Sequence, residues 1–215
     1  MLPKPTLRSI LELRLKPKVE PVTPILTIGK YALVTPPKPP GPSLAGKPPC
    51  QAWNTVHFGM WEFKSRLHGI AYGEALHKAY AEWFIRVNGG LYDKVLVEES
   101  FNLAPFSAKP DIVYCKANEC GLIEVKGFST DKIAKALPQL SMYAYILRSL
   151  GINLVQAWLV MRNAVLPFNP DYLLKDGEHW FRVVRNWVRN PPKGPAVDCR
   201  KCPYALVCGI RRIGK

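Results

Sequence analysis

The chain has 215 residues, of which 48% are apolar and 21% are charged. These values are typical of one folded domain with a small appendage, and they exclude a disordered chain. No apolar run is long enough to span a membrane, and the first residues lack the apolar core of a secretory signal. We therefore expect a soluble cytoplasmic protein with no membrane partner.

The charge is strongly positive, because 30 Lys and Arg face only 16 Asp and Glu, giving a formal charge of +14. A basic balance of this size favours a phosphate-rich partner, with nucleic acid as the first candidate. The alternative is a charged surface that serves solubility or thermostability. Proteins with such a surface are normally enriched in Glu as well as Lys, whereas acidic residues are scarce in this chain.

The N-terminal segment, residues 1–49, contains 12 of the 21 prolines. Proline fixes extended backbone and removes hydrogen-bond donors, so we expect a proline-rich strap or linker, with one or two short edge strands within residues 22–34. Residues 50–215 then form the main domain.

Hydrophobic periodicity predicts the elements of the main domain in chain order. They are a helix over 65–87, strands within 91–106, a hairpin of strands 111–115 and 121–128 joined by 116–119, a helix over 138–150, a strand within 152–163, and a helix over 171–190. This order indicates an α/β (α+β) fold with a mixed central sheet flanked by helices.

The hairpin carries charged residues among apolar ones. Alternation along its second strand places Glu124 and Lys126 on one face, and Asp111 begins the first strand. Two converging carboxylates repel unless a cation lies between them, and Mg²⁺ or Mn²⁺ would serve and could activate a water. The alternative is that Glu124 and Lys126 form the solvent face of an ordinary strand.

Two helices offer additions to this hairpin. His77 lies on the packed face of the first helix, where it is either a core histidine or a nitrogen ligand beside the two carboxylates. Gln139 and Tyr143 are one turn apart on the second helix, where they reach a phosphate or water, or form a surface turn with Tyr143 half-buried.

Six cysteines indicate metal or redox chemistry. Cys199, Cys202 and Cys208 lie within ten residues, and Cys50 is the obvious fourth ligand for tetrahedral zinc or an iron–sulfur cluster. Cys115 and Cys120 bracket the hairpin connection, as free core thiols or a disulfide.

The C-terminal residues 182–215 hold nine Lys or Arg and one acid. With Trp180 and Trp187 nearby, phosphate contacts and base stacking favour a single-stranded nucleic acid.

In their order and spacing, these residues resemble the RecB-like branch of the PD-(D/E)xK nucleases. The matching segments are GEALH, ending at His77, then Pro110 with Asp111, Glu124-Val125-Lys126, and the QxxxY pair of Gln139 and Tyr143. With one cysteine before this core and three after it, the chain is similar to the CRISPR-associated exonucleases of the fourth Cas type. The resemblance spans about Cys50 to Cys208 and leaves the proline-rich segment unplaced.

The resemblance implies a restriction-endonuclease-like core and specific roles. His77, Asp111, Glu124 and the Val125 carbonyl would bind Mg²⁺ or Mn²⁺, and Lys126 would orient or help deprotonate the attacking water and offset transition-state charge. Gln139 and Tyr143 would position substrate or Lys126. A [4Fe–4S] cluster on Cys50, Cys199, Cys202 and Cys208 would join the strap to a knuckle at 199–208.

The implied activity is exonucleolytic cleavage of single-stranded DNA or overhangs, with a role in CRISPR spacer acquisition beside the integrase complex. Two other functions fit the same residues. One is a non-catalytic, metal-stapled DNA-binding module, and the other is a repair nuclease of the same fold outside CRISPR.

Overall fold

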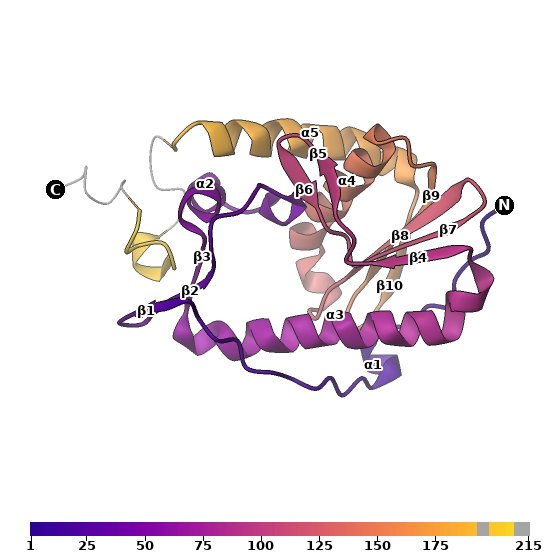
Figure 1. Cartoon of the computed structure of the whole chain (residues 1–215), viewed down its shortest axis with the longest axis horizontal. Coiled ribbons are helices and arrows are strands. Elements are labelled where there is room, and N and C mark those ends of the chain that lie inside the picture. The colour runs from indigo at the N-terminus through magenta and orange to yellow at the C-terminus, as the bar shows by residue number, and fades with distance from the viewer. Residues whose placement is uncertain (193–197, 209–215) are drawn as a thin grey trace.

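The computed structural model describes residues 1–192 and 198–208, and its elements are shown in Figure 1. The α-helices are α1 (Ile10–Leu13), α2 (Pro49–Phe58), α3 (Leu67–Asn88), α4 (Ile133–Ser149) and α5 (Pro170–Arg189). The strands are β1 (Leu26–Ile28), β2 (Tyr31–Thr35), β3 (Met60–Phe63), β4 (Lys94–Val97), β5 (Phe101–Leu103), β6 (Phe106–Ala108), β7 (Ile112–Lys116), β8 (Glu119–Val125), β9 (Leu154–Val160) and β10 (Val165–Phe168). Short 3-10 turns are η1 (Pro42–Leu44), η2 (Lys64–Arg66), η3 (Gly89–Leu91), η4 (Thr130–Lys132) and η5 (Cys199–Lys201).

The core is a mixed sheet in the order β10-β9-β8-β7-β4, flanked by helices on both faces. Strands β8 and β9 are parallel and joined through α4, whereas the other neighbours are antiparallel. Because successive residues of a strand face opposite sides, Ile123 and Val125 pack with α3, and Leu122 packs with α4 and α5. The expected mixed sheet between helices is confirmed (Figure 1).

Two predicted boundaries were wrong. Helix α4 begins at Ile133, five residues before the expected Pro138, which lies buried inside the helix. A proline there removes one helical hydrogen bond, but burial of Ala136 and contact of the Pro138 ring with Gly46 hold the preceding turn in place. Strand β8 spans Glu119–Val125 rather than 121–128, since the hairpin turns tightly at Ala117, whose N–H donates to Asp93.

Helix α2 was not predicted from the sequence. In a proline-rich segment, Pro48 and Pro49 indicate extended backbone. However, a proline in the first turn of a helix already has the helical φ angle and loses no hydrogen bond. The helix therefore begins where the sequence indicated only the end of a strap. It brings Cys50 into an ordered first turn.

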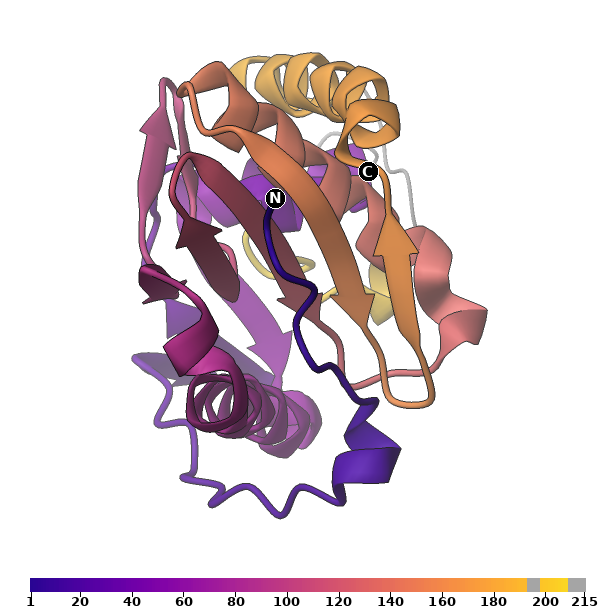
Figure 2. The same ribbon diagram turned by 90° about the vertical axis from the view of Figure 1, so that its right-hand side faces the viewer.

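The proline-rich segment is an integral part of the fold. Strands β1 and β2 form at the place expected, but β2 pairs with both β1 and β3 and is therefore the central strand of a small sheet rather than an edge strand. The N–H groups of Ile10 and Leu11 donate to the carbonyls of Met161 and Arg162. In Figure 2 the N-terminal stretch runs over the sheet before it reaches α1, and the side-chain amide of Gln156 on β9 donates to the Leu2 carbonyl.

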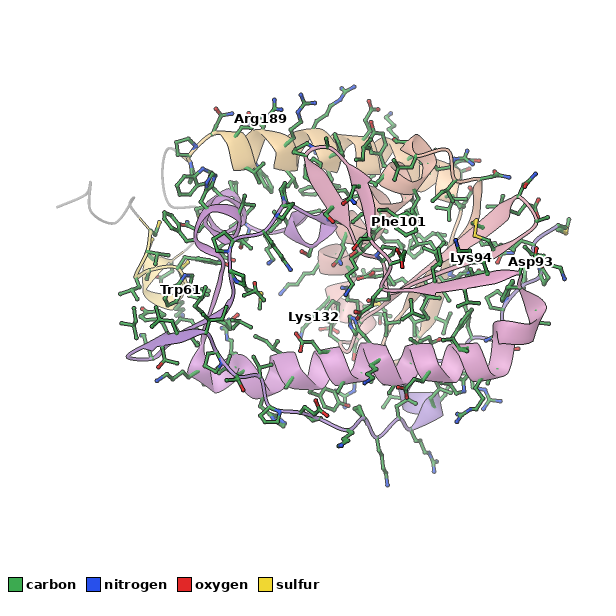
Figure 3. All side chains as sticks on the ribbon, in the orientation of Figure 1. Trp61, Asp93, Lys94, Phe101, Lys132 and Arg189 are labelled. Atoms are coloured by element: carbon green, nitrogen blue, oxygen red, sulfur yellow. A yellow bond between two sulfur atoms is a disulfide. The ribbon has the colours of Figure 1, made fainter. Side chains whose placement is uncertain are left out.

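Cys115 and Cys120 form a disulfide between directly opposed residues of β7 and β8. The bond is visible in Figure 3 close to Lys94, at the end of the hairpin away from Asp111. Of the two alternatives, the structure therefore has the disulfide. In the part of the chain described, no helix is both long and apolar enough to cross a membrane.

Helices α4 and α5 pack in close backbone contact at Gly177, where an added Cβ would lie 2.1 Å from the Ser141 carbonyl oxygen. Replacing a helical glycine by alanine ordinarily stabilises a protein. We predict the opposite for Gly177→Ala, a loss of about 2 kcal/mol in the free energy of unfolding, because the helices must separate. Denaturant unfolding measures the change.

Gly73→Ala is the matched control, because an added Cβ there meets nothing within 4 Å. It should raise the free energy of unfolding by about 0.5 kcal/mol. Equal effects of the two substitutions would contradict the close packing of α4 on α5.

Candidate active site

The acidic residues predicted on the hairpin meet at one end of the sheet. Asp111 precedes β7, Glu124 lies near the end of β8, and Lys126 follows it. Asp111 is 8% exposed and Glu124 only 1%, so the interpretation of Glu124 and Lys126 as a solvent face is wrong. A buried carboxylate needs a partner or a cation.

Asp111 is held by two donors from different elements. Its Oδ1 lies 2.9 Å from His77 Nδ1 on α3, and its Oδ2 accepts from the Val125 N–H at 2.7 Å. Burial acts to raise the pKa of Asp111, but the His77 hydrogen bond and the charges of His77 and Lys126 outweigh it and lower the pKa. Asp111 is therefore ionised at neutral pH.

The pKa of His77 is raised, whereas that of Asp111 is lowered. Burial acts to lower its pKa, but the hydrogen bond and charge of Asp111, with a contribution from Glu124, raise it. His77 thus lies beside the acids, as one of its two interpretations expected, rather than among apolar residues of the core.

Glu124 is the least satisfied group of the site. Its Oε1 pairs with Lys126 Nζ at 2.5 Å, while its buried Oε2 has no hydrogen-bond partner among the described residues. Burial raises the pKa of Glu124 to about 7, with repulsion from Asp111 adding to the effect and Lys126 opposing it. A cation at Oε2 would relieve both burial and repulsion.

Lys126 is fixed by a chain of hydrogen bonds from α4. Its Nζ donates to Gln139 Oε1 at 2.9 Å, Gln139 Nε2 donates to the Tyr143 hydroxyl at 3.2 Å, and that hydroxyl donates to the Lys109 carbonyl at 2.8 Å. Tyr143 is 4% exposed, so the surface-turn interpretation of this pair is wrong. Gln139 and Tyr143 position Lys126.

The charge of Lys126 follows from its neighbours. Burial acts to lower its pKa, but Glu124 and Asp111 outweigh burial and raise the pKa. The side chain is therefore an ammonium group. It is suited to orient a water and offset negative charge, and it is not suited to remove a proton.

The donor set fits a hard divalent cation, because it combines two carboxylates with a nearby imidazole. Among the described residues, however, no three His, Cys, Asp or Glu side chains are arranged as a ready metal-binding group. The carboxylates engage Lys126, His77 and the Val125 N–H instead. Glu124 Oε2 is free to bind a cation as it stands. Binding by the other carboxylate oxygens would require small shifts of the groups that now contact them.

The predicted cysteine ligands lie in a separate part of the molecule. Cys199, Cys202 and Cys208 belong to the segment 198–208, which packs beside α2, the helix that carries Cys50. Its contacts include a 2.6 Å hydrogen bond between the hydroxyls of Thr55 and Tyr204. In Figure 3, Trp61 lies next to this segment, and it packs with Cys202 and Tyr204.

Two amide side chains of α2 point at cysteine sulfurs. Gln51 Nε2 lies 3.9 Å from Cys202 Sγ, and Asn54 Nδ2 lies 3.8 Å from Cys208 Sγ. Burial raises the pKa of Cys202, and the nearby Cys50 and Cys199 thiols add to the rise. The four cysteines predicted as one ligand set thus share one neighbourhood, but among the described residues no three of them are arranged as a ready metal-binding group.

The site also includes lysines that the sequence did not single out. A cavity of about 330 Å³ adjoins Tyr143 and is lined by Lys38 and Pro42 of the N-terminal segment and by Lys109. Lys47 lies close enough to Lys38 and Lys126 for their charges to act on it. No sequence pattern could place these lysines here, since some 80 residues separate Lys47 from Lys126.

Comparisons with known proteins give distant likenesses only. The sequence matches no protein-family model and no curated protein. Among solved structures, it resembles the crystal structure of SSO0001 at 15% identity with a TM-score of 0.44, covering 79% of this chain and 85% of that chain. It also resembles an alkaline exonuclease (LHK-Exo) from Laribacter hongkongensis at 13% identity with a TM-score of 0.37, covering 56% and 70%.

The burial of Glu124 gives a pH-dependent prediction for the metal-free protein. The folded pKa of about 7 lies above the ordinary glutamate value of 4.5, so folding favours the protonated form. Its contribution is fully present below pH 4.5 and is lost as the pH rises through 7. We predict that Glu124→Gln stabilises the protein by about 2 kcal/mol at pH 8, with no gain at pH 4.5.

Denaturant unfolding in the presence of a chelator measures this difference at the two pH values. Glu178→Gln on α5 serves as the control, since the half-buried Glu178 pairs with Arg182 at the surface and has no other ion pair among the described residues. A Glu124→Gln effect that does not change with pH would show that the carboxylate is not strained by burial.

Proposed function

We propose that this protein is a divalent-metal-dependent deoxyribonuclease with a RecB-like, restriction-endonuclease-like core. The observation that carries the proposal is the buried acid pair, in which Glu124 Oε2 has no partner among the described residues and Lys126 lies alongside as an ammonium group. Buried acids beside a fixed cationic side chain suit the hydrolysis of a phosphodiester.

Asp111, Glu124 and His77 would hold Mg²⁺ or Mn²⁺, with the Val125 carbonyl as a further ligand. The cation supplies Lewis acidity and neutralises phosphate charge. Lys126, held by Gln139 and indirectly by Tyr143, donates hydrogen bonds to a water or a phosphate oxygen and offsets the charge that develops on phosphorus.

The substrate we propose is DNA, acted on as a single strand or an overhang by an exonuclease. The formal charge of +14 supports a polyanionic substrate. Aromatic side chains with basic neighbours support stacking on unpaired bases, and the partly buried Trp180 and Trp187 on α5 meet edge to face.

Asp111→Asn and Glu124→Gln should each lower Mn²⁺-dependent cleavage of end-labelled single-stranded DNA by about a thousandfold, because each removes a charge from the cation site. Gel analysis of the products measures the rate and shows whether cleavage starts at an end. Isothermal titration with Mn²⁺ should show weaker binding to both variants.

Asp131→Asn is the matched control, because Asp131 is exposed in η4 and takes part in none of the hydrogen bonds or ion pairs that hold Asp111 and Glu124. It should leave cleavage unchanged. DNA binding by the unaltered protein without any divalent-dependent cleavage would reject the enzyme and favour the non-catalytic DNA-binding module.

We also propose a [4Fe–4S] cluster on Cys50, Cys199, Cys202 and Cys208. The amide donors of Gln51 and Asn54 directed at two of the sulfurs support it, because hydrogen bonds to sulfur are typical of cluster sites. The same four thiols suit zinc, and the chemistry of the donors alone does not separate the two.

The anaerobically purified protein should be brown, with iron and labile sulfide near the cubane ratio of about four each per chain. Cys202→Ala should lose the colour and most of the iron. Gln51→Ala is the informative companion, since it should keep the cluster but shift its reduction potential. A colourless protein with stoichiometric zinc would replace the cluster by a zinc site.

For the biological role, we propose trimming of spacer precursors for a CRISPR integrase complex. The motif order from His77 through Tyr143, flanked by cysteines, supports this choice. Genes for an integrase beside the gene for this protein would agree with it, whereas a repair-gene neighbourhood would favour the repair nuclease.

A further inference from the structure

We propose that the proline-rich N-terminal segment forms one wall of the substrate groove, where Lys38 and Lys47 bind backbone phosphates of a DNA strand that leads to Lys126. The inference deepens the proposed function, on which it rests for the identity of the substrate. It assigns a role to the part of the chain that the motif resemblance leaves unplaced.

The groove is the cavity of about 330 Å³ beside Tyr143. Its lining combines Lys38, Pro39 and Ser43 of the N-terminal segment with Ser107, Lys109 and Tyr143 of the main domain. Since the Tyr143 hydroxyl is two hydrogen bonds away from Lys126, the inner end of the groove adjoins the acid pair. A groove lined by ammonium and hydroxyl groups suits a phosphate backbone.

Two backbone contacts hold the segment against the domain. The Ser107 N–H donates to the Pro40 carbonyl at 2.9 Å, and Gly41 approaches so closely that a Cβ there would lie 2.8 Å from the Ser107 carbonyl oxygen. Further along, Gly46 has a φ of +76°, which favours glycine, and its turn rests on Pro138 of α4. The backbone next to Lys38 and Lys47 is therefore held in place.

The lysines form a cluster of like charges. Neither Lys38 nor Lys47 makes an ion pair within 4 Å among the described residues, although acids are available elsewhere on the surface. Burial lowers the pKa of Lys47; Glu62 opposes this, while the charges of Lys38 and Lys126 lower the pKa further. Lys38 is exposed, lines the cavity and has no ion pair among the described residues, so it is suited to bind a phosphate that enters the cavity.

The other lysine of the groove is already neutralised. Lys109 Nζ pairs with Glu98 Oε2 at 2.6 Å, so Lys109 adds little net positive charge. The attraction for phosphate in this groove thus comes from the N-terminal segment. Removing the charge of those two side chains should therefore weaken the binding of a DNA strand.

The test measures binding of fluorescein-labelled oligothymidine by anisotropy in EDTA, as a function of salt, on the full-length protein. The Lys38→Gln/Lys47→Gln variant should bind about tenfold more weakly, with a log–log salt slope less steep by about 1.4, since each lost phosphate contact on a single strand removes about 0.7. The exposed Lys38→Gln alone, which leaves the packing intact, should remove about half of that slope change.

Lys18→Gln is the matched control, because Lys18 belongs to the same segment but lines a different cavity, against Glu74 and Glu82 on α3. It should bind as the unaltered protein does. Equal slopes for the control and for both Lys38 variants would overturn the proposed groove.

Cleavage with Mn²⁺, measured in parallel, separates this inference from the proposed function. Salt-dependent binding that needs Lys38 and Lys47 supports the groove even if no variant cleaves DNA, in which case only the nuclease is rejected. Cleavage that is unaffected by the double substitution rejects the groove and leaves the nuclease in place. Absence of DNA binding by the unaltered protein rejects both.

Discussion

The ionic cluster around Glu124 and Asp111 is the constraint on which the rest of this structure depends. Two carboxylates buried at one end of an apolar sheet are unstable unless donors surround them. Those donors come from separate elements, since His77 lies on α3 and Lys126 follows β8. The helices on opposite faces of the sheet must therefore be placed accurately. Close contacts such as that of Gly177 with the Ser141 carbonyl oxygen provide this accuracy.

The cluster is balanced in charge but incomplete in hydrogen bonding. Lys126 and His77 offset the two acids, while Glu124 Oε2 stays buried without a partner among the described residues. On its other side the site meets the lysines of the N-terminal segment. Oxygen ligands suited to a cation thus lie next to ammonium groups suited to an anion. In the proposed function, a phosphodiester bound together with a metal ion would use both kinds of group.

The two ends of the chain support each other at a distance from the acids. Strand β2 pairs with β3, and the segment 198–208 packs onto α2 and Trp61. The position of the lysine-bearing strap therefore depends on the α2 and cysteine region as well as on its own contacts with Ser107 and α4. A cluster or zinc ion at the cysteines would bind the first turn of α2 to that segment. Loss of the metal would then loosen the groove as well as the knuckle.

The sequence by itself determined the long helices, the hairpin and its acids, because periodicity of 3.6 or 2 residues is a local property that burial imposes. The resemblance carried by the order of Asp111, Glu124, Lys126, Gln139 and Tyr143 implied that these residues converge, whereas their spacing alone left other interpretations open. It did not reveal α2, whose first-turn prolines resemble extended backbone, or the early start of α4 before Pro138. Nor did it choose between a solvent face and a buried site for Glu124, since strand alternation is the same for both. Only the tertiary structure decided that choice, and it alone brought Lys38 and Lys47 to the site, because contacts between residues far apart in sequence leave no local pattern.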